Sequence, residues 1–459
     1  MDPVPPSYAL DGNSTILLKL KRTAPILAKL DIHSLEVLSG AALAFVLRAV
    51  GAGLAFALNV VIGRLLGAEG AGLYFLALSV VTIGAVITKL GLDNTLLRFI
   101  AFGASSGDWD RVLGVFRMGM RLVAGTSLAA AATVLTLAPW MADHVFGEPA
   151  LAPTLRVMSL GIFSLATMAL LAESLKGLRR IRNAMLVSGV LYPAIALVVI
   201  WPLASSFGAP GAATAYVLGT GTAAAIGWAM WRTNVAGVAA PSPVFERAVL
   251  WQSCRPLWIM SIIKQGILPW APLFLLGIWG TAADTGVFGA AIRVSMLVSF
   301  FLGAVNTVIA PKFADLHARG EIEIMGGLAR RFALVVTLAA SPLLLTLIFA
   351  GDWVMGLFGP DFVRGSAALA ILGLGQAVNT MTGSVGFLLI MTGHERDARN
   401  ASIVSACLLT GFAILLVPSH GLIGAAIASA VSTASLHLLS AALVKKRLGI
   451  CMIPIGGHG

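Results

Sequence analysis

Apolar runs of about 20 residues recur along the whole chain, and they constrain its fold more than any other feature. A helix of that length crosses the ~30 Å hydrocarbon core of a bilayer, because each residue adds about 1.5 Å. Composition agrees, since 58% of the 459 residues are hydrophobic and only 11% are charged. A soluble protein of this size needs more charge. The sequence therefore predicts an all-α polytopic membrane protein and excludes a barrel of short alternating strands.

We expect twelve membrane spans, joined by connections too short to hold a soluble domain. They lie near 38–63, 71–92, 113–139, 153–175, 183–203, 210–231, 256–279, 286–310, 329–350, 366–392, 399–418 and 421–444. Any function must therefore be carried out in or beside the membrane.

The basic residues predict the orientation, because loops rich in Lys and Arg stay in the cytoplasm. One set of loops carries 24 of the 31 basic residues, in the ranges 19–29, 98–121, 176–182, 232–255, 312–331 and 396–447. The opposite loops hold only Arg64, Arg156 and Arg364. Both termini are therefore expected in the cytoplasm. The net charge of +11 is mostly this topology signal, so it requires no nucleic acid.

The two halves of the chain resemble each other. LLGAEGAGLYFLALS (65–79) is similar to IWGTAADTGVFGAAI (278–292), and FGAPGAATA (207–215) is similar to HGLIGAAIA (420–428). Six spans precede the second copy, so the sequence predicts two parallel six-helix repeats, a transporter architecture with its substrate site between the lobes. The expected parts are a basic N-terminal segment (1–37), an N-lobe (38–232), a linker (233–255), a C-lobe (256–444) and a tail (445–459).

Four basic residues lie inside the predicted spans: Arg48, Lys89, Lys264 and Arg293. Lys89 is near a span end, from which its side chain is expected to reach the interface. Each of the others costs about 2.5–3.5 kcal/mol at a helix centre, and no acidic residue is available nearby to pair with it. Backbone carbonyls or water can cap such a cation, which is the alternative to a ligand.

The repeat favours an anion-binding cavity. The two copies are offset by about 213 residues, so the position that corresponds to Arg48 is 261. Lys264 is three residues further on, and residues three apart share a helix face. Each lobe thus places a cation on its first helix, and Arg293 adds a third. The polar side chains expected to extend this lining are Asn59, Gln265, Asn306, Gln376 and Asn379. Arginine suits phosphate because its donors form a fork.

Two further features concern motion and metals. Pro269 and Pro272 follow Lys264 and predict a bend, which is either a hinge or a static kink. The three cysteines are scattered and the histidines dispersed, so we expect no disulfide framework and no metal site. His437, the one histidine placed inside a span, is expected to pack between helices.

The stretch GRLLGAEGAGLYFLALSVVTIGAVITKLGLDNTLLRFIA (63–101) resembles the start of Wzx-type polysaccharide flippases, and FGPDF (358–362) and GHERDARNA (393–401) also resemble that family. The superfamily includes the multidrug MATE exporters and the lipid II flippase. The resemblance implies a twelve-span, two-lobed alternating-access transporter with a cationic cavity for the diphosphate of a polyprenyl-linked sugar. It also implies that Arg48 and Arg293 match, in kind, the cavity arginines of the lipid II branch. That branch has two more spans, which favours the Wzx-type branch.

The function expected is therefore export of a polyprenyl-diphosphate-linked oligosaccharide across the bacterial cytoplasmic membrane, without an enzymatic reaction or a cofactor. The alternatives are a cation-coupled multidrug exporter, which needs buried acids, and a membrane glycan polymerase or ligase, which needs large outer loops. Coupling to a proton or sodium gradient, and contact with a polysaccharide polymerase or export machinery, stay open.

Overall fold

The computed structural model describes residues 32–238 and 247–452, over which the chain forms helices and no strand. Most of the basic N-terminal segment and the end of the tail lie outside these described residues. The first half comprises α2 (Ile32–Thr88), α3 (Leu92–Ser106), α4 (Trp109–Trp140), η2 (Met141–Val145), α5 (Leu151–Gly177), α6 (Ile181–Met185), η3 (Leu186–Leu191) and α7 (Tyr192–Asn234). The second half comprises α8 (Arg247–Ser261), η4 (Ile262–Ile267), α9 (Leu268–Trp279), α10 (Ala282–Ala318), α11 (Ile322–Phe349), α12 (Gly351–Gly356), η5 (Pro360–Gly365), α13 (Ser366–Thr382), α14 (Val385–Met391) and α15 (Glu395–Leu448).

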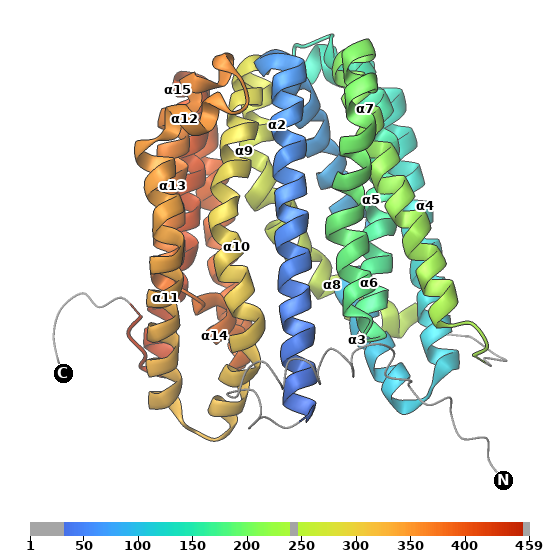
Figure 1. The fold of residues 1–459 in the computed structure, drawn as a ribbon, viewed down its shortest axis with the longest axis vertical. Helices are drawn as coiled ribbons and strands as arrows, with labels where there is room; N and C mark the ends of the chain where they lie inside the picture. The colour runs from blue at the N-terminus through green and yellow to red at the C-terminus, as the bar shows by residue number, and fades with distance from the viewer. Residues whose placement is uncertain (1–31, 239–246, 453–459) are drawn as a thin grey trace, which may run out of the picture.

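The helices stand side by side in two groups (Figure 1). Helices α2–α7 form the N-lobe and α9–α15 form the C-lobe, with α8 between them. The α3 and α14 helices lie at one end of the molecule, and α12 lies at the other. We refer to these as the α14 end and the α12 end.

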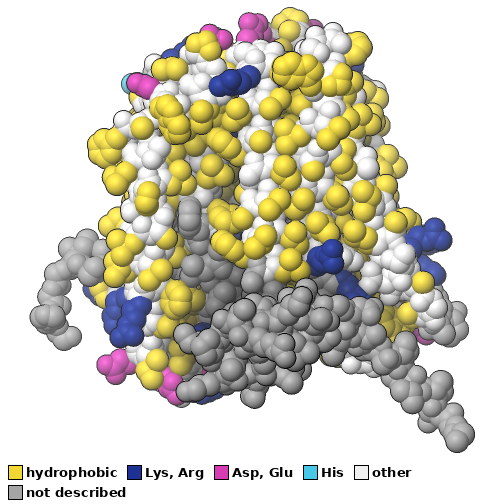
Figure 2. Space-filling model, viewed as in Figure 1, with side chains coloured by type: hydrophobic (Ala, Val, Ile, Leu, Met, Phe, Trp, Pro, Cys, Tyr) yellow, Lys and Arg dark blue, Asp and Glu magenta, His cyan; other side chains and the backbone are white. Residues whose placement is uncertain are grey.

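The flanks of the bundle are apolar, as a lipid-facing surface requires. Figure 2 shows hydrophobic side chains along the visible helices, with charged side chains gathered toward the two ends. Large apolar side chains are exposed there, including Val198 (79%) and Phe349 (80%). Exposed apolar surface on this scale marks a membrane-embedded or interacting surface. The prediction of a multi-pass helical membrane protein is confirmed.

In the described residues, eight helices are long and apolar enough to cross a membrane, and α13 with α14 makes a ninth candidate, bent by 44°. Helices α2, α7 and α15 each contain a glycine with non-helical backbone angles, namely Gly67, Gly208 and Gly421. The α15 helix holds two of the predicted spans, α2 holds nearly all of two, and α7 holds the later part of one and the whole of the next. The total of twelve spans stays a prediction.

The internal repeat appears in matching backbone contacts. Gly208 (φ 59°) and Gly421 (φ 49°) break α7 and α15, and their numbers differ by 213. Glycine allows this positive φ because it has no Cβ. Just after each break, a Cβ on Gly211 would lie 1.9 Å from the carbonyl oxygen of Leu203, and one on Gly424 would lie 2.4 Å from that of Leu416. These pairs also differ by 213, so the lobes repeat the same corner.

Near the α12 end, the two lobes meet at a reciprocal backbone crossing of α2 and α10. A Cβ on Gly72 would lie 1.7 Å from the carbonyl oxygen of Ala282, and one on Gly286 would lie 1.9 Å from that of Ala68. Both 282 minus 68 and 286 minus 72 give 214, so each repeat presents the same pair of small residues to the other. Small residues let membrane helices approach closely and gain van der Waals contact.

Other contacts hold the lobes together at the α12 end. Arg64 donates a hydrogen bond from Nε to the carbonyl oxygen of Leu357 at 2.7 Å, and the backbone N–H of Ala282 donates to Glu148 Oε1 at 3.3 Å. One buried apolar cluster runs through both lobes here, and includes Phe75, Phe288 and Phe358. Toward the α14 end, the buried side chains form separate clusters, one in each lobe. The described lobes are therefore joined at the α12 end.

The seventh predicted span links the lobes in an irregular way. Its first part, α8, packs on α3, and Leu250 and Cys254 belong to the N-lobe cluster. Its second part, α9, packs beside α15 in the C-lobe. The π-helical turn η4 separates the two parts, with Pro269 directly after it in the first turn of α9. A π-turn followed by proline interrupts the regular hydrogen-bond ladder, so the predicted bend coincides with the place where the helix changes lobes.

We expect a Gly286→Leu variant to separate the lobes at the α12 end, because the added side chain has no room beside Ala68. Overpacking of this kind costs about 1–3 kcal/mol. Spin labels on Ser205→Cys and Asp352→Cys, both exposed at that end on opposite lobes, would report the separation after the native cysteines are replaced by serine. Gly125→Leu is the matched control, since nothing lies within 4 Å of that position. An unchanged label distance and unchanged melting temperature in Gly286→Leu would contradict the crossing.

Candidate functional site

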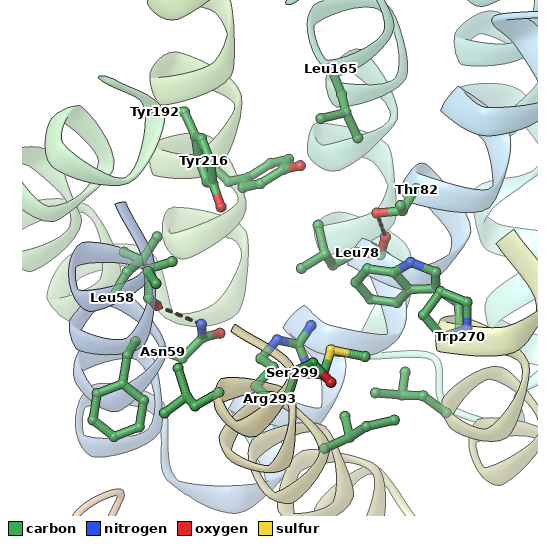
Figure 3. Close-up of a pocket in the computed structure, with 18 of the residues that line it drawn as sticks. Leu58, Asn59, Leu78, Thr82, Leu165, Tyr192, Tyr216, Trp270, Arg293 and Ser299 are labelled. Carbon is green, nitrogen blue, oxygen red and sulfur yellow. Dashed lines mark hydrogen bonds between the residues drawn. The ribbon is translucent and has the colours of Figure 1, made fainter. Parts of the chain in front are cut away.

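A cavity of about 690 Å³ lies between the lobes. On α2 the lining residues are at positions 52–59 and 74–82, one group in each of the two helical segments that meet at the Gly67 break. Both segments extend from the α12 end toward the α14 end, so the cavity lies on the α14 side of Gly72. The remaining walls come from α5, η3, α7, α9 and α10 (Figure 3). This is the position, between the repeats, that the sequence predicts for a substrate site.

Arg293 on α10 is the one charged side chain among the residues lining this cavity. Its Nη1 donates a hydrogen bond to the carbonyl oxygen of Gly289 at 2.7 Å. Its guanidinium carbon lies 3.9 Å from the centre of the Phe75 ring and 5.4 Å from that of Trp270. Its Nη2 is buried and has no hydrogen-bond partner among the described residues. A buried donor without a partner costs about 1–3 kcal/mol, more when charged, so an acceptor supplied to this guanidinium would stabilise it.

The crossing builds this arginine site. Gly289 lies one turn after Gly286, and a Cβ there would be 2.4 Å from the Phe75 ring. The absence of a side chain lets Phe75 pack directly against α10. Arg293, one turn further on, then stacks on the same ring. Cation–π contacts contribute about 0.5–2 kcal/mol, most when desolvated, so Phe75 holds the guanidinium without neutralising it.

Three tyrosines share the cavity: Tyr74, Tyr192 and Tyr216. The chain has only four, and Tyr8 lies outside the described residues. The rings of Tyr192 and Tyr216 meet edge to face, with centroids 6.2 Å apart. Figure 3 shows both on the side of the cavity opposite Arg293. Tyrosine joins an apolar ring to a hydroxyl that seeks a partner, which suits a ligand that is part apolar and part polar.

Of the predicted polar lining, Asn59 is in the cavity, where its Nδ2 donates to the carbonyl oxygen of Ala55 at 2.6 Å. Arg48 lies one turn before Ala52, on the same face of α2 and closer to the α14 end. It is exposed, and its Nη1 lies 4.0 Å from the Cβ position of Gly303 on α10. The structure thus places Arg48 beyond the lining, next to α10.

Lys264, Gln376 and Asn379 line a second cavity of about 220 Å³, inside the C-lobe. The repeat predicted that Lys264 and Arg48 line one cavity, and the structure contradicts this prediction. His437, expected to pack between helices, lines this second cavity too. Pro269 borders both cavities, whereas Pro272 is buried in α9.

Gln265 and Asn306 line neither cavity, which corrects their predicted place. Gln265 accepts a hydrogen bond from Lys89 Nζ at 2.9 Å. Asn306 is buried and accepts a hydrogen bond from Ser384 Oγ. Both amides are therefore used in contacts within the protein.

The expectation that Lys89 reaches the interface is wrong. It is buried, and its Nζ lies 3.2 Å from Asp93 Oδ2, with the side chains of both about 8% exposed. Gln265 Nε2 lies 3.4 Å from the same carboxylate oxygen. Lys89, Asp93 and Gln265 therefore form a small polar cluster that attaches η4 to the N-lobe. The sequence missed it because Gln265 is 176 positions from Lys89.

Sequence reasoning also missed Phe75, Trp270 and the tyrosines. The scarcity of tyrosine, with three of four copies inside predicted spans, is a signal that points to them. Phe75 and Trp270, the two rings that contact Arg293, have no such signal, because Phe and Trp are common in membrane helices. Among the described residues, no group of three or more His, Cys, Asp or Glu is placed to hold a metal ion.

Known proteins share this sequence pattern and fold. The profile of the family described as "Polysaccharide biosynthesis protein" matches residues 37–317. A protein of Haloferax volcanii named "Probable low-salt glycan biosynthesis flippase Agl15" is 22% identical over 398 residues, covering 85% of this chain and 79% of that protein.

Two solved structures show the same two-lobed fold. One is an inward-facing multidrug resistance MATE family transporter, with a TM-score of 0.73, 17% identity and coverage of 86% of this chain and 94% of the other. The second is the lipid II flippase MurJ in an inward closed conformation, with a TM-score of 0.69, 14% identity and coverage of 87% of both chains. The family match spans well over half of the 459 residues. The chain therefore belongs to the polysaccharide biosynthesis protein family.

Proposed function

We propose that this protein is a flippase that moves a polyprenyl-diphosphate-linked oligosaccharide across the bacterial cytoplasmic membrane by alternating access. The observation that carries the proposal is Arg293, a cation that lines the cavity between the lobes and whose buried Nη2 has no partner among the described residues. A phosphate oxygen supplies the missing acceptor and the missing negative charge together. The family and the named flippase among its relatives support the same substrate class.

The charge of the cavity separates this proposal from multidrug efflux. None of the residues lining the 690 Å³ cavity is Asp or Glu. Among the described residues, the one buried acid is Asp93, and it is already paired with Lys89. A cationic drug would meet Arg293 without a compensating carboxylate, at a cost of like-charge repulsion and desolvation. An anionic headgroup gains from the same arrangement.

A glycan polymerase or ligase is also disfavoured. Bond-forming enzymes of this kind need a general base, a nucleophile or a metal aligned at the site. Arg293, Asn59 and the tyrosines provide binding and orientation for a ligand. The named relatives are a flippase and transporters, in line with binding and release in place of a reaction.

The packing suggests how the cavity is exposed. The buried apolar side chains of the two lobes form one cluster at the α12 end and separate clusters toward the α14 end. We infer that the headgroup enters from the α14 end, beside Arg48, while the polyprenyl chain stays in the lipid. Because most basic loops belong to this end, we assign it to the cytoplasm. Movement of α9 at η4 and Pro269 would accompany the closing of this end and the opening of the crossing. Coupling of the cycle to a proton or sodium gradient stays a prediction. Transfer of the product to a polymerase or export complex also stays a prediction.

Arg293→Gln should abolish most of the activity, because it removes the charge and the forked donors while keeping similar volume. Losing a charge-assisted hydrogen bond costs about 1.5–3 kcal/mol, or roughly 10- to 150-fold in substrate binding. In a host strain with the gene deleted, lipid-linked glycan should accumulate and surface polysaccharide should fall. The wild type should restore both, Arg293→Lys in part and Arg293→Gln hardly at all.

The matched control is Arg156→Gln, which changes an exposed arginine far from the cavity lining. It should complement as well as the wild type at equal expression. Full complementation by Arg293→Gln would remove the main support for the proposal. Normal lipid-linked intermediates in the deletion strain, together with new sensitivity to cationic drugs, would favour efflux instead.

The assigned orientation predicts which side Cys451 faces. This exposed residue follows α15 at the α14 end, and Cys407 can be replaced by serine. A membrane-impermeant maleimide should label Cys451 in inverted vesicles and leave it unlabelled in intact spheroplasts. Ser205→Cys, exposed at the α12 end, should show the reverse pattern. Labelling of Cys451 in intact spheroplasts would reverse the assignment.

A further inference from the structure

A second, polar pocket adjoins the main cavity inside the C-lobe. It has a volume of about 220 Å³ and is bounded by η4, α9, α10, α13 and α15. Pro269, Ile292, Met296 and Ser299 line both spaces, so the pocket and the cavity share a wall. A ligand held at Arg293 therefore has a neighbouring compartment within the same lobe.

One wall of this pocket is a fixed set of polar groups. Gln376 Oε1 accepts hydrogen bonds from Ser299 Oγ at 2.9 Å and from Asn379 Nδ2 at 3.0 Å. These bonds leave Gln376 Nε2 without a hydrogen bond to another described residue. Asn379 is only 6% exposed, and its buried Oδ1 has no hydrogen-bond partner among the described residues. The wall thus presents one donor, Gln376 Nε2, to whatever fills the pocket.

The pocket also has an uncompensated cation. Lys264 reaches it from η4 and makes no hydrogen bond or ion pair with another described residue. No Asp or Glu is among the residues lining the pocket, and His437 is its other titratable side chain. A lysine inside a membrane protein normally has a counter-charge or faces a water-filled path to a ligand. The pocket is therefore suited to an anionic group.

The repeat shows why the C-lobe is hollow here and the N-lobe is not. Subtracting 213, the offset of the matching corners, relates Ser429 to Tyr216 and Ser405 to Tyr192. In the N-lobe those two tyrosines fill the space and face the main cavity. In the C-lobe the serines are small, and both line the pocket. The difference between the lobes thus produces a polar recess at the place that aromatic rings fill in the first copy.

We propose that this C-lobe pocket binds one acidic sugar residue of the transported glycan, with Lys264 pairing with its carboxylate. This inference rests on the proposed function. About 220 Å³ is roughly seven times the ~30 Å³ that one water molecule occupies in the liquid, enough for one sugar ring. Sugar hydroxyls both donate and accept hydrogen bonds, which matches the unused Gln376 Nε2 donor and the serine hydroxyls of the lining. The pocket is therefore a saccharide subsite, distinct from the phosphate contact at Arg293.

The test uses the full chain in lipid nanodiscs and saturation-transfer NMR with three probes: D-glucuronate, D-glucose and inorganic pyrophosphate. The wild type should bind glucuronate about tenfold more tightly than glucose. Lys264→Gln should remove that preference and leave glucose binding unchanged. Ser429→Tyr, which installs the residue of the N-lobe position, should fill the pocket and abolish binding of both sugars. Ser205→Tyr, on the exposed surface, is the matched control and should bind like the wild type.

Pyrophosphate distinguishes this inference from the proposed function. Its binding should survive Lys264→Gln and Ser429→Tyr and be lost in Arg293→Gln. Unchanged glucuronate binding in both pocket variants would overturn the subsite, even if Arg293→Gln still lost pyrophosphate. Loss of pyrophosphate in Lys264→Gln would make the pocket a phosphate site and overturn the sugar assignment. Pyrophosphate binding that Arg293→Gln leaves intact would contradict the proposed role of Arg293 instead.

Discussion

The rest of the structure depends on the close crossing of α2 and α10 at Gly72 and Gly286. Each repeat contributes the same pair of small residues, and each glycine lies against a backbone carbonyl of the other lobe. In a membrane, where lipid removes the hydrophobic drive for helices to associate, such close contact is a main source of attraction. A side chain at either position would need the backbones to move apart. The crossing therefore fixes both the separation of the lobes and the depth of the cavity behind it.

The same crossing determines how an arginine can exist in that cavity. Phe75 follows Gly72 on α2, Gly289 and Arg293 follow Gly286 on α10, and the ring lies between the glycine and the guanidinium. The cation and Trp270 belong to the C-lobe, whereas the closer aromatic ring, Phe75, belongs to the N-lobe. Opening the α12 end would thus draw Arg293 away from Phe75, so the ligand's contact with the arginine is linked to the position of the lobes. Alternating access requires that the ligand bind the two conformations of the transporter with different free energies.

Sequence reasoning predicted the features that depend on local pattern. Apolar runs predicted the membrane helices, the repeat predicted two lobes, and the lack of nearby acids pointed to Arg48, Lys264 and Arg293 together, of which only Arg293 lines the main cavity. It failed where a side chain has two plausible partners from distant segments. Gln265 could face the cavity or Lys89, and only the packing of η4 against the N-lobe decides between them. Phe75 was missed because phenylalanine is common in membrane helices and carries no sequence signal for the side it faces, whereas the tyrosines had a signal, their scarcity, that was not used.

The central claim is that a diphosphate is moved through a cavity in which Arg293 binds it. The most direct measurement is transport in proteoliposomes, using a short fluorescent glycan linked to polyprenyl diphosphate and a membrane-impermeant quencher to follow its leaflet. The account predicts rapid translocation by the wild type, a rate at least tenfold lower for Arg293→Gln, and a clearly slower rate for the monophosphate-linked glycan. Equal rates for the two lipids, or for the two proteins, would contradict it.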